Sequence, residues 1–168
     1  MSSLRLLNET SGSSVATVQV TNVFSEDFDV YKITMEHDGS TNGNSNLRYL
    51  GQDGSVYAAD EYTFASLYGY VHTTHSESKL EGTNTIQDAF GNWEEGGSVT
   101  WIFNPYSKDS QTHNITQSIG YAGTTTPATP MRCIGMAREK NRFTGFQCAI
   151  STGTYGTITI RTYGLRVD

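Results

Sequence analysis

Residues 31–36 read Tyr-Lys-Ile-Thr-Met-Glu, and apolar side chains alternate there with polar ones. Successive side chains of a β-strand point to opposite faces, so this alternation predicts a half-buried strand. Residues 15–20, 99–103 and 157–161 repeat the pattern, and further segments bring the expected total to nine or ten short strands. No long helical period interrupts them, so we expect at most one or two short helical turns. The sequence therefore predicts an all-β protein: one antiparallel, jelly-roll-like β-sandwich domain over residues 1–168.

Turn-forming residues predict where the strands stop. Residues 38–44 are nearly all turn formers, and residues 83–97 are mostly polar, so both are expected to be loops. Residues 131–137 and 145–151 look like the two arms of a hairpin. Another strand is expected to carry three apolar side chains on one face, namely Ile115, Ile119 and Tyr121.

The composition excludes several classes of protein. The chain has 168 residues, a formal net charge of -6 and only 17% charged residues. An acidic surface repels phosphate backbones and anionic lipid surfaces, so we expect neither nucleic acid nor a membrane as a partner. No run of about 18 apolar residues is present, and the first residues lack the basic start of a signal peptide.

The two cysteines, Cys133 and Cys148, lie on the arms of the expected hairpin. A two-residue loop at Lys140 and Asn141 would place them directly opposite each other, as a hydrogen-bonded pair. Side chains diverge at such a pair, and a disulfide fits there poorly. We therefore expect two free thiols that fill the core.

Metal ligands occur only in weak patterns. His72 and His75 are three residues apart, a spacing that puts them on opposite faces of a strand. Oxygen ligands gather at residues 26–29 and again at residues 38–44, either of which is a candidate calcium loop, although solvated turns explain both more simply. We expect no metal and no cofactor.

Catalytic motifs are absent from the sequence. Glu94 and Glu95 stand beside Trp93, but adjacent acids in a loop are usually solvated, whereas glycoside cleavage needs two carboxylates held across a cleft. There is no nucleophile elbow, P-loop or dinucleotide fingerprint. We expect a protein that is not an enzyme.

Aromatic side chains in or near the expected loops are the candidates for contacts with a ligand or partner. These are Trp93, Tyr106, Tyr121 and Tyr155. Aromatic rings among Asn, Ser and Gly suit recognition of sugars or proteins. The alternative is that they pad the ends of strands.

Two segments resemble a known group of proteins. Residues 24–33 read FSEDFDVYKI after a Thr/Val strand, and residues 145–165 read GFQCAISTGTYGTITIRTYGL. Together they resemble the small β-rich virion structural proteins of tailed bacteriophages, which occur in tail fibres and baseplates and as capsid decorations. The resemblance implies a jelly-roll-like sandwich used for assembly, located in the virion after assembly in the host cytoplasm.

We therefore expect a non-enzymatic phage virion structural protein whose partners are other virion proteins and, as a homo-oligomer, further copies of itself. Residues 1–8 are the candidate anchoring arm, through Leu4, Leu6 and Leu7. The alternative is a receptor-binding or carbohydrate-binding module at a fibre tip, with a host surface glycan as ligand. A sugar-cleaving or peptide-cleaving enzyme is the third hypothesis.

Overall fold

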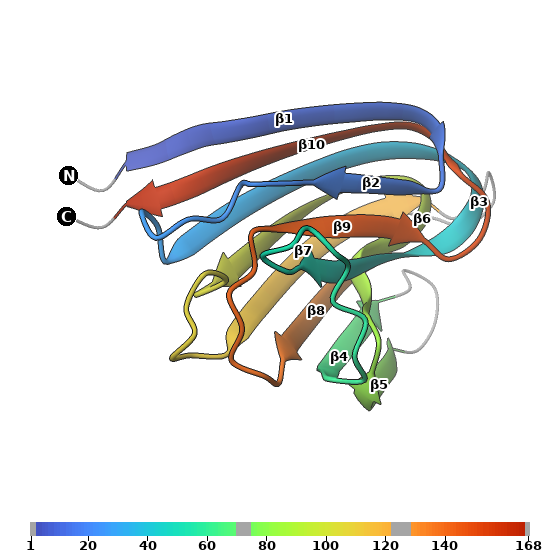
Figure 1. The fold of residues 1–168 in the computed structure, drawn as a ribbon. Helices are drawn as coiled ribbons and strands as arrows, with labels where there is room; N and C mark the ends of the chain where they lie inside the picture. The colour runs from blue at the N-terminus through green and yellow to red at the C-terminus, as the bar shows by residue number, and fades with distance from the viewer. Residues whose placement is uncertain (1–2, 70–74, 122–128, 167–168) are drawn as a thin grey trace.

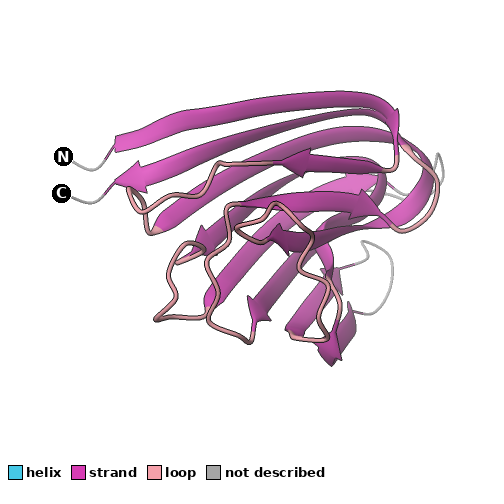
Figure 2. Ribbon diagram, in the orientation of Figure 1, coloured by secondary structure: helices cyan, strands magenta, loops and turns pink. Residues whose placement is uncertain are grey.

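The computed structural model describes residues 3–69, 75–121 and 129–166, without the side chains of 40–42, 92–93 and 129. This part of the chain consists of ten antiparallel strands joined by loops and turns (Figures 1 and 2). No helix occurs in these residues, so none could span a membrane. The expected all-β antiparallel sandwich is confirmed. The strands are β1 (Ser3–Val15), β2 (Thr17–Val20), β3 (Val30–Leu50), β4 (Tyr62–Gly69), β5 (His75–Thr83), β6 (Ile86–Phe103), β7 (Thr112–Tyr121), β8 (Thr129–Ala137), β9 (Gly145–Ile150) and β10 (Tyr155–Arg166).

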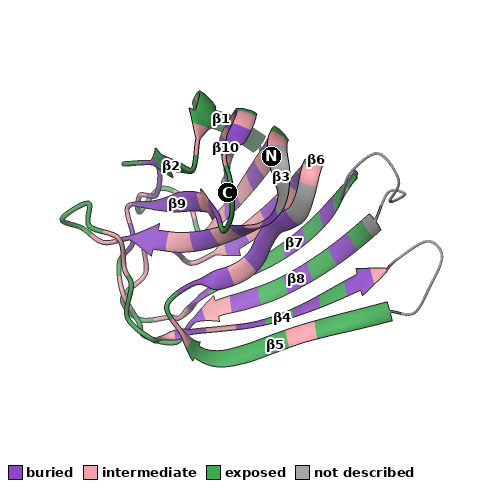
Figure 3. Ribbon diagram, turned by 90° about the vertical axis from the view of Figure 1, so that its right-hand side faces the viewer, coloured by how far each residue is buried: buried purple, intermediate pink, exposed green. Residues whose placement is uncertain are grey.

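Most strands form one large sheet in the order β1-β10-β3-β6-β7-β8-β4-β5. Strands β2 and β9 pair with each other, and β9 also pairs with the second half of β3. Strands β3 and β6 are long enough to belong to both parts: residues 30–38 of β3 lie in the large sheet, and residues 45–50 pair with β9. Figures 1 and 3 show β2 and β9 on one side of the large sheet, which thus has an inner face toward them and an outer face away from them.

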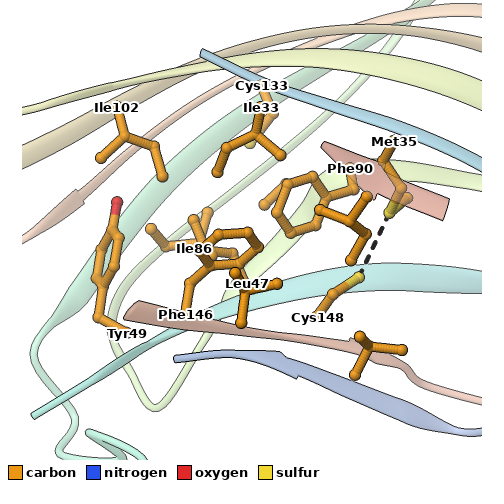
Figure 4. Close-up of a cluster of buried hydrophobic side chains, with 14 of the residues drawn as sticks. Ile33, Met35, Leu47, Tyr49, Ile86, Phe90, Ile102, Cys133, Phe146 and Cys148 are labelled. Atoms are coloured by element: carbon orange, nitrogen blue, oxygen red, sulfur yellow. Dashed lines mark hydrogen bonds between the residues drawn. The ribbon is translucent and has the colours of Figure 1, made fainter. Parts of the chain in front are cut away.

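The core lies between these two layers. Ile33 and Met35 point inward from β3, as the alternation of residues 31–36 predicts, and both are fully buried. They meet Leu47, Phe146 and Cys148 from the opposite layer, and the Cys148 thiol lies 3.5 Å from the Met35 sulfur (Figure 4). Burying a side chain of this size stabilises the fold by about 1.5–3 kcal/mol, so this shared cluster holds the layers together.

Two expected loops are strand instead. Residues 38–44 lie within β3 and residues 86–97 within β6, because the two segments pair with each other, for example Gly43 with Trp93. A side chain at Gly43 would come within 2.9 Å of Ile150 and of the Thr152 carbonyl oxygen. The glycine that looks like a turn former is therefore needed for close packing, and tertiary pairing overrides the local turn preference.

The expected hairpin of residues 131–151 is wrong. Strand β8 pairs with β7 and β4, and β9 pairs with β2 and β3, so Cys133 and Cys148 lie on strands that do not pair with each other. Both are buried free thiols, as expected, but separation in the fold is the reason rather than hairpin geometry. Burial raises the pKa of each thiol to about 12, which leaves both uncharged and unreactive.

Candidate functional site

Strand β7 buries its polar side chains and exposes its apolar ones. Thr116 and its even-numbered neighbours point inward and are buried, whereas Ile115, Ile119 and Tyr121 point outward and are 40%, 56% and 55% exposed. The Thr116 hydroxyl donates to the Ala89 carbonyl oxygen at 2.6 Å, which compensates its burial. The three apolar residues share one face, as the sequence predicts, but that face is the outer one.

Neighbouring strands extend this apolar surface. Ile134 on β8 lies directly opposite Ile115 and is 53% exposed, and Leu67 on β4 is exposed on the same side. Figure 3 shows the alternation of buried and exposed residues along β7, β8 and β4 that produces it. We call the side chains of Leu67, Ile115, Ile119, Tyr121 and Ile134 the outer apolar patch. Gln117 and Arg132 are the exposed polar residues among them. Several exposed apolar groups on one face, interspersed with polar ones, are typical of an interaction surface.

The outer face of the sheet is hollowed beside this patch. One hollow of about 640 Å³ is lined by Ala65, Ile134 and Met136, with Lys79 and His113 among the polar groups around them. A second hollow of about 470 Å³ lies over Gly97, where no side chain fills the space between β3 and β7. The face therefore offers recesses for the side chains of a partner.

One end of the outer face is acidic. Asp38, Glu95 and Tyr121 are consecutive partners across β3, β6 and β7, so two carboxylates stand in line with an exposed ring. A hollow of about 400 Å³ there is lined by Asp38 and Glu95 together with Glu36 and Thr157. Carboxylates beside an aromatic ring can hold a sugar through hydrogen bonds and stacking.

The candidate metal loops do not converge on a site in this structure. In the turn at residues 26–29 the Ser25 hydroxyl donates to Asp27, as in an ordinary solvated turn. Asp38 faces Glu95 across the sheet, and three side chains of the 38–44 segment lie outside the described residues, as does His72. Among the side chains that the structure describes, no three of His, Cys, Asp and Glu are grouped to hold a metal ion.

The candidate aromatic residues are dispersed. Tyr121 is exposed in the outer apolar patch, and Tyr106 is half-buried with the Arg142 guanidinium 5.4 Å from its ring centre. Tyr155 is a correction: it is fully buried, and its hydroxyl donates to Ser45, so it is a core residue and not a contact residue. The side chain of Trp93 lies outside the described residues.

The candidate anchoring arm is part of the sheet. Residues from Ser3 onward belong to β1, which pairs with β10 along its length, and their role in anchoring stays a prediction. Leu4 and Leu6 are exposed on the outer face, beside Leu165 and Tyr163, whereas Leu7 packs against the core. A strand partner satisfies the backbone polar groups that a free arm would leave to water, which is why the segment is ordered.

Two buried ionisable residues escaped the sequence analysis. Asp88 is 1% exposed and accepts a hydrogen bond from the Tyr68 hydroxyl, and burial raises its pKa. His37 is also buried, packs edge-on against Tyr155 and has its pKa lowered by burial. His37 continues the alternation of Tyr31, Ile33 and Met35, so the sequence could have predicted that its side chain points inward. Asp88 lay in an expected loop and gave no such signal.

Comparisons with known proteins show only distant likenesses. No family model and no curated protein matches the chain. Solved structures that are similar include sucrose-6-phosphate hydrolase from Lactobacillus gasseri (14% identity, 96% of this chain and 28% of that one, TM-score 0.34). Others are congerin II liganded with lactose and MES (13%, 87% and 98%, 0.36) and the baseplate tripod of bacteriophage Tuc2009 (9%, 94% and 62%, 0.23).

The chain spans little more than a quarter of the hydrolase chain. Likenesses this distant carry no information on function, because β-sandwiches host many unrelated activities. What the chain can do has to be argued from its own surface.

Proposed function

We propose that this protein is a non-enzymatic structural protein of a phage virion, which assembles with other virion proteins through the outer apolar patch. The reversed alternation of β7 carries the proposal, since its isoleucines face outward while threonine, asparagine and serine fill the interior. The apolar side chains of such a strand are available for contacts with another protein, since they do not contribute to the core of their own domain.

The energetics favour a permanent partner over transient exposure. Ile115, Ile119 and Ile134 are each at least 40% exposed in the isolated chain. Covering apolar surface is favourable by roughly 25 cal/mol for each Å², from which the entropy cost of association is subtracted, and permanent interfaces are more apolar than transient ones. Residues 24–33 and 145–165 resemble phage virion proteins, and this resemblance is the reason for proposing a virion as the assembly.

The proposal is tested by incorporation into particles. Phage carrying Ile115→Thr/Ile134→Thr should lack the protein, because threonine keeps the preference for strand but removes apolar surface. The matched control is Gln19→Thr, an exposed change on β2, on the other layer of the sandwich. Labelling intact particles with an antibody to this chain reads out the result. Normal incorporation of the double variant, or a wild-type protein found on no particle, would contradict the proposal.

A second candidate is glycan recognition at a fibre tip, which the line of Asp38, Glu95 and Tyr121 favours. It predicts saturable binding to a host-surface glycan that Tyr121→Ala abolishes. The same purified protein tests the enzyme hypothesis, since turnover of that glycan lost in Glu95→Gln would contradict a purely structural role.

A further inference from the structure

Strand β5 is an open edge of the large sheet. Among the described residues it pairs with β4 alone, and each of its nine residues is exposed or half-buried. Figure 3 shows β5 as the lowest strand, with no other strand beyond it. Its backbone groups on that side are free to hydrogen-bond to another strand.

The charges of β5 alternate in sign along one side. Its sequence is HSESKLEGT, and the odd-numbered residues His75, Glu77, Lys79 and Glu81 share one face. Charged residues on an edge usually prevent strand pairing, because like charges meet when two edges approach. The order of charges on β5 is different. Two antiparallel copies of this strand can be aligned so that no two like charges lie opposite each other.

We propose that two copies of this chain pair through their β5 strands, antiparallel, with Ser78 opposite Ser78 of the second copy. In that register Glu77 faces Lys79 of the second copy, and Glu81 faces His75. Each lysine thus meets a glutamate, and no two like charges lie opposite each other.

Other registers are less favourable. With Lys79 opposite its own counterpart, two lysines meet and Glu77 faces Glu81. With Glu77 opposite its own counterpart, two glutamates meet and Lys79 faces His75. With Leu80 at the centre, Lys79 still faces Glu81, but Glu77 faces Thr83 and gains nothing. Charge complementarity therefore selects both the occupant and the register.

The ion pairs within the chain do not compete strongly. Lys79 lies 3.3 Å from Glu77 and Arg138 lies 3.4 Å from Glu81, but both carboxylates are more than 70% exposed. Exposed pairs of this kind contribute little, so these side chains can be shared with a second copy.

The β5 pairing adds a dimer to the proposed function, and the use of that dimer in a virion rests on the proposed function. Joining two β5 edges continues the large sheet across a two-fold axis and puts both outer faces on one side. Because Lys79, Leu80 and Glu81 also line the 640 Å³ hollow, the hollows of both copies would flank the axis. A dimer of this kind presents a doubled apolar surface to the rest of the virion.

Charge reversal tests the inference in purified protein. Sedimentation at about 0.1 M salt should show a dimer for the wild type. Lys79→Glu sets two glutamates opposite each other on both sides of the axis, so the dimer dissociation constant should rise at least about tenfold. Glu77→Lys/Lys79→Glu restores opposite charges and should restore the dimer. Circular dichroism checks that the variants, changed only at exposed positions, remain folded.

Cross-linking tests the register. Ser78→Cys should be joined to its counterpart by a short thiol cross-linker, whereas Ser76→Cys, which faces Leu80 of the second copy, should not. The native thiols are buried and do not interfere. A monomeric wild type, a dimer indifferent to Lys79→Glu, a double variant that stays monomeric, or preferential cross-linking at Ser76→Cys would overturn the inference.

Failure of the dimer and failure of the proposed function remain distinguishable. A monomer that still enters particles overturns the pairing alone, and a dimer that is absent from particles overturns the virion role alone. Ile115→Thr/Ile134→Thr should still dimerise, because it leaves β5 unchanged.

Discussion

Ile115 on β7 lies directly opposite Ile134 on β8, and both side chains point away from the core of the protein. The next pair, Asn114 with Gly135, points inward, and a side chain at Gly135 would lie 2.6 Å from the Asn114 amide oxygen. At this pair the interior has no room for a larger side chain at Gly135, whereas the isoleucines of the neighbouring pair stand outside. This inversion connects the packing of the domain to its proposed role in assembly.

The outer isoleucines should contribute little to the stability of the isolated chain. We expect Ile134→Thr to change the free energy of unfolding by no more than about 0.5 kcal/mol, as is usual for surface substitutions. Ile33→Ala, which empties a fully buried position, should cost about 2–5 kcal/mol. Urea unfolding of the two variants provides the comparison, and a large loss for Ile134→Thr would mean that its side chain is packed within the domain.

Gly145 should tolerate no side chain. A Cβ atom there would collide with the carbonyl oxygen of Val20, where the end of β2 lies beside the start of β9. Since backbone cannot move aside as a side chain can, Gly145→Ala should cost at least about 2 kcal/mol. Gly69→Ala is the control, because its nearest neighbour would be Pro130 at an ordinary 3.5 Å. Equal melting temperatures for the two variants would refute the expected collision.

His37 should make the fold sensitive to mild acid. Burial lowers its pKa, so the folded chain binds the imidazole proton more weakly than the unfolded chain does. This contribution to stability is present above a pH of about 6.5 and is lost as the pH falls toward the lowered pKa. His37→Phe, which keeps a ring against Tyr155, should remove that loss. Unfolding free energies measured across pH 5–8 would test it, and identical profiles for both proteins would contradict it.

Asp88 should act in the opposite direction. Burial raises its pKa, so the folded chain holds the carboxyl proton more tightly, and stability falls as the pH rises from about 3.8 through the raised pKa. Asp88→Asn can still accept the Tyr68 hydrogen bond without a buried charge, and it should be more stable than the wild type at pH 7 but not at pH 3.5. Urea unfolding at both pH values measures this, with the exposed change Glu26→Gln as control. A variant less stable at pH 7 would mean that the charge itself is needed.

Several elements of the fold could be predicted from local pattern. Alternation in residues 31–36, 99–103 and 157–161 placed strands where β3, β6 and β10 are found, because a strand with one buried face must carry its apolar residues at every second position. The tight turn after β3, in which the Gly54 amide donates to the Gly51 carbonyl oxygen, is also local, since Gly54 has a φ of 77° that other residues rarely adopt.

The candidate site was harder to predict. Parity grouped Ile115, Ile119 and Tyr121 correctly, but the apolar side of an alternating strand is ordinarily its buried side, whereas β7 buries its polar side. Local pattern also failed for Tyr155, which was expected to contact a ligand or partner. Its hydroxyl donates to Ser45, and this contact exists only because β3 and β10 come together in the fold. A polar tip is compatible with burial once a partner exists, and that partner is distant in sequence.

The sequence by itself determined that the chain is all-β, because the two-residue period of its side chains is a property of each strand alone. It also determined that the strands are antiparallel, because no helical period supplies the crossovers that parallel strands need. The tertiary structure alone decided which strands pair, that β3 and β6 run through segments rich in turn formers, and which face of β7 meets the core. Those outcomes depend on hydrogen bonds and close contacts between residues far apart in the chain, such as Gly43 with Trp93 and Gly145 with Val20. The energy of such contacts exists only once the layers have met.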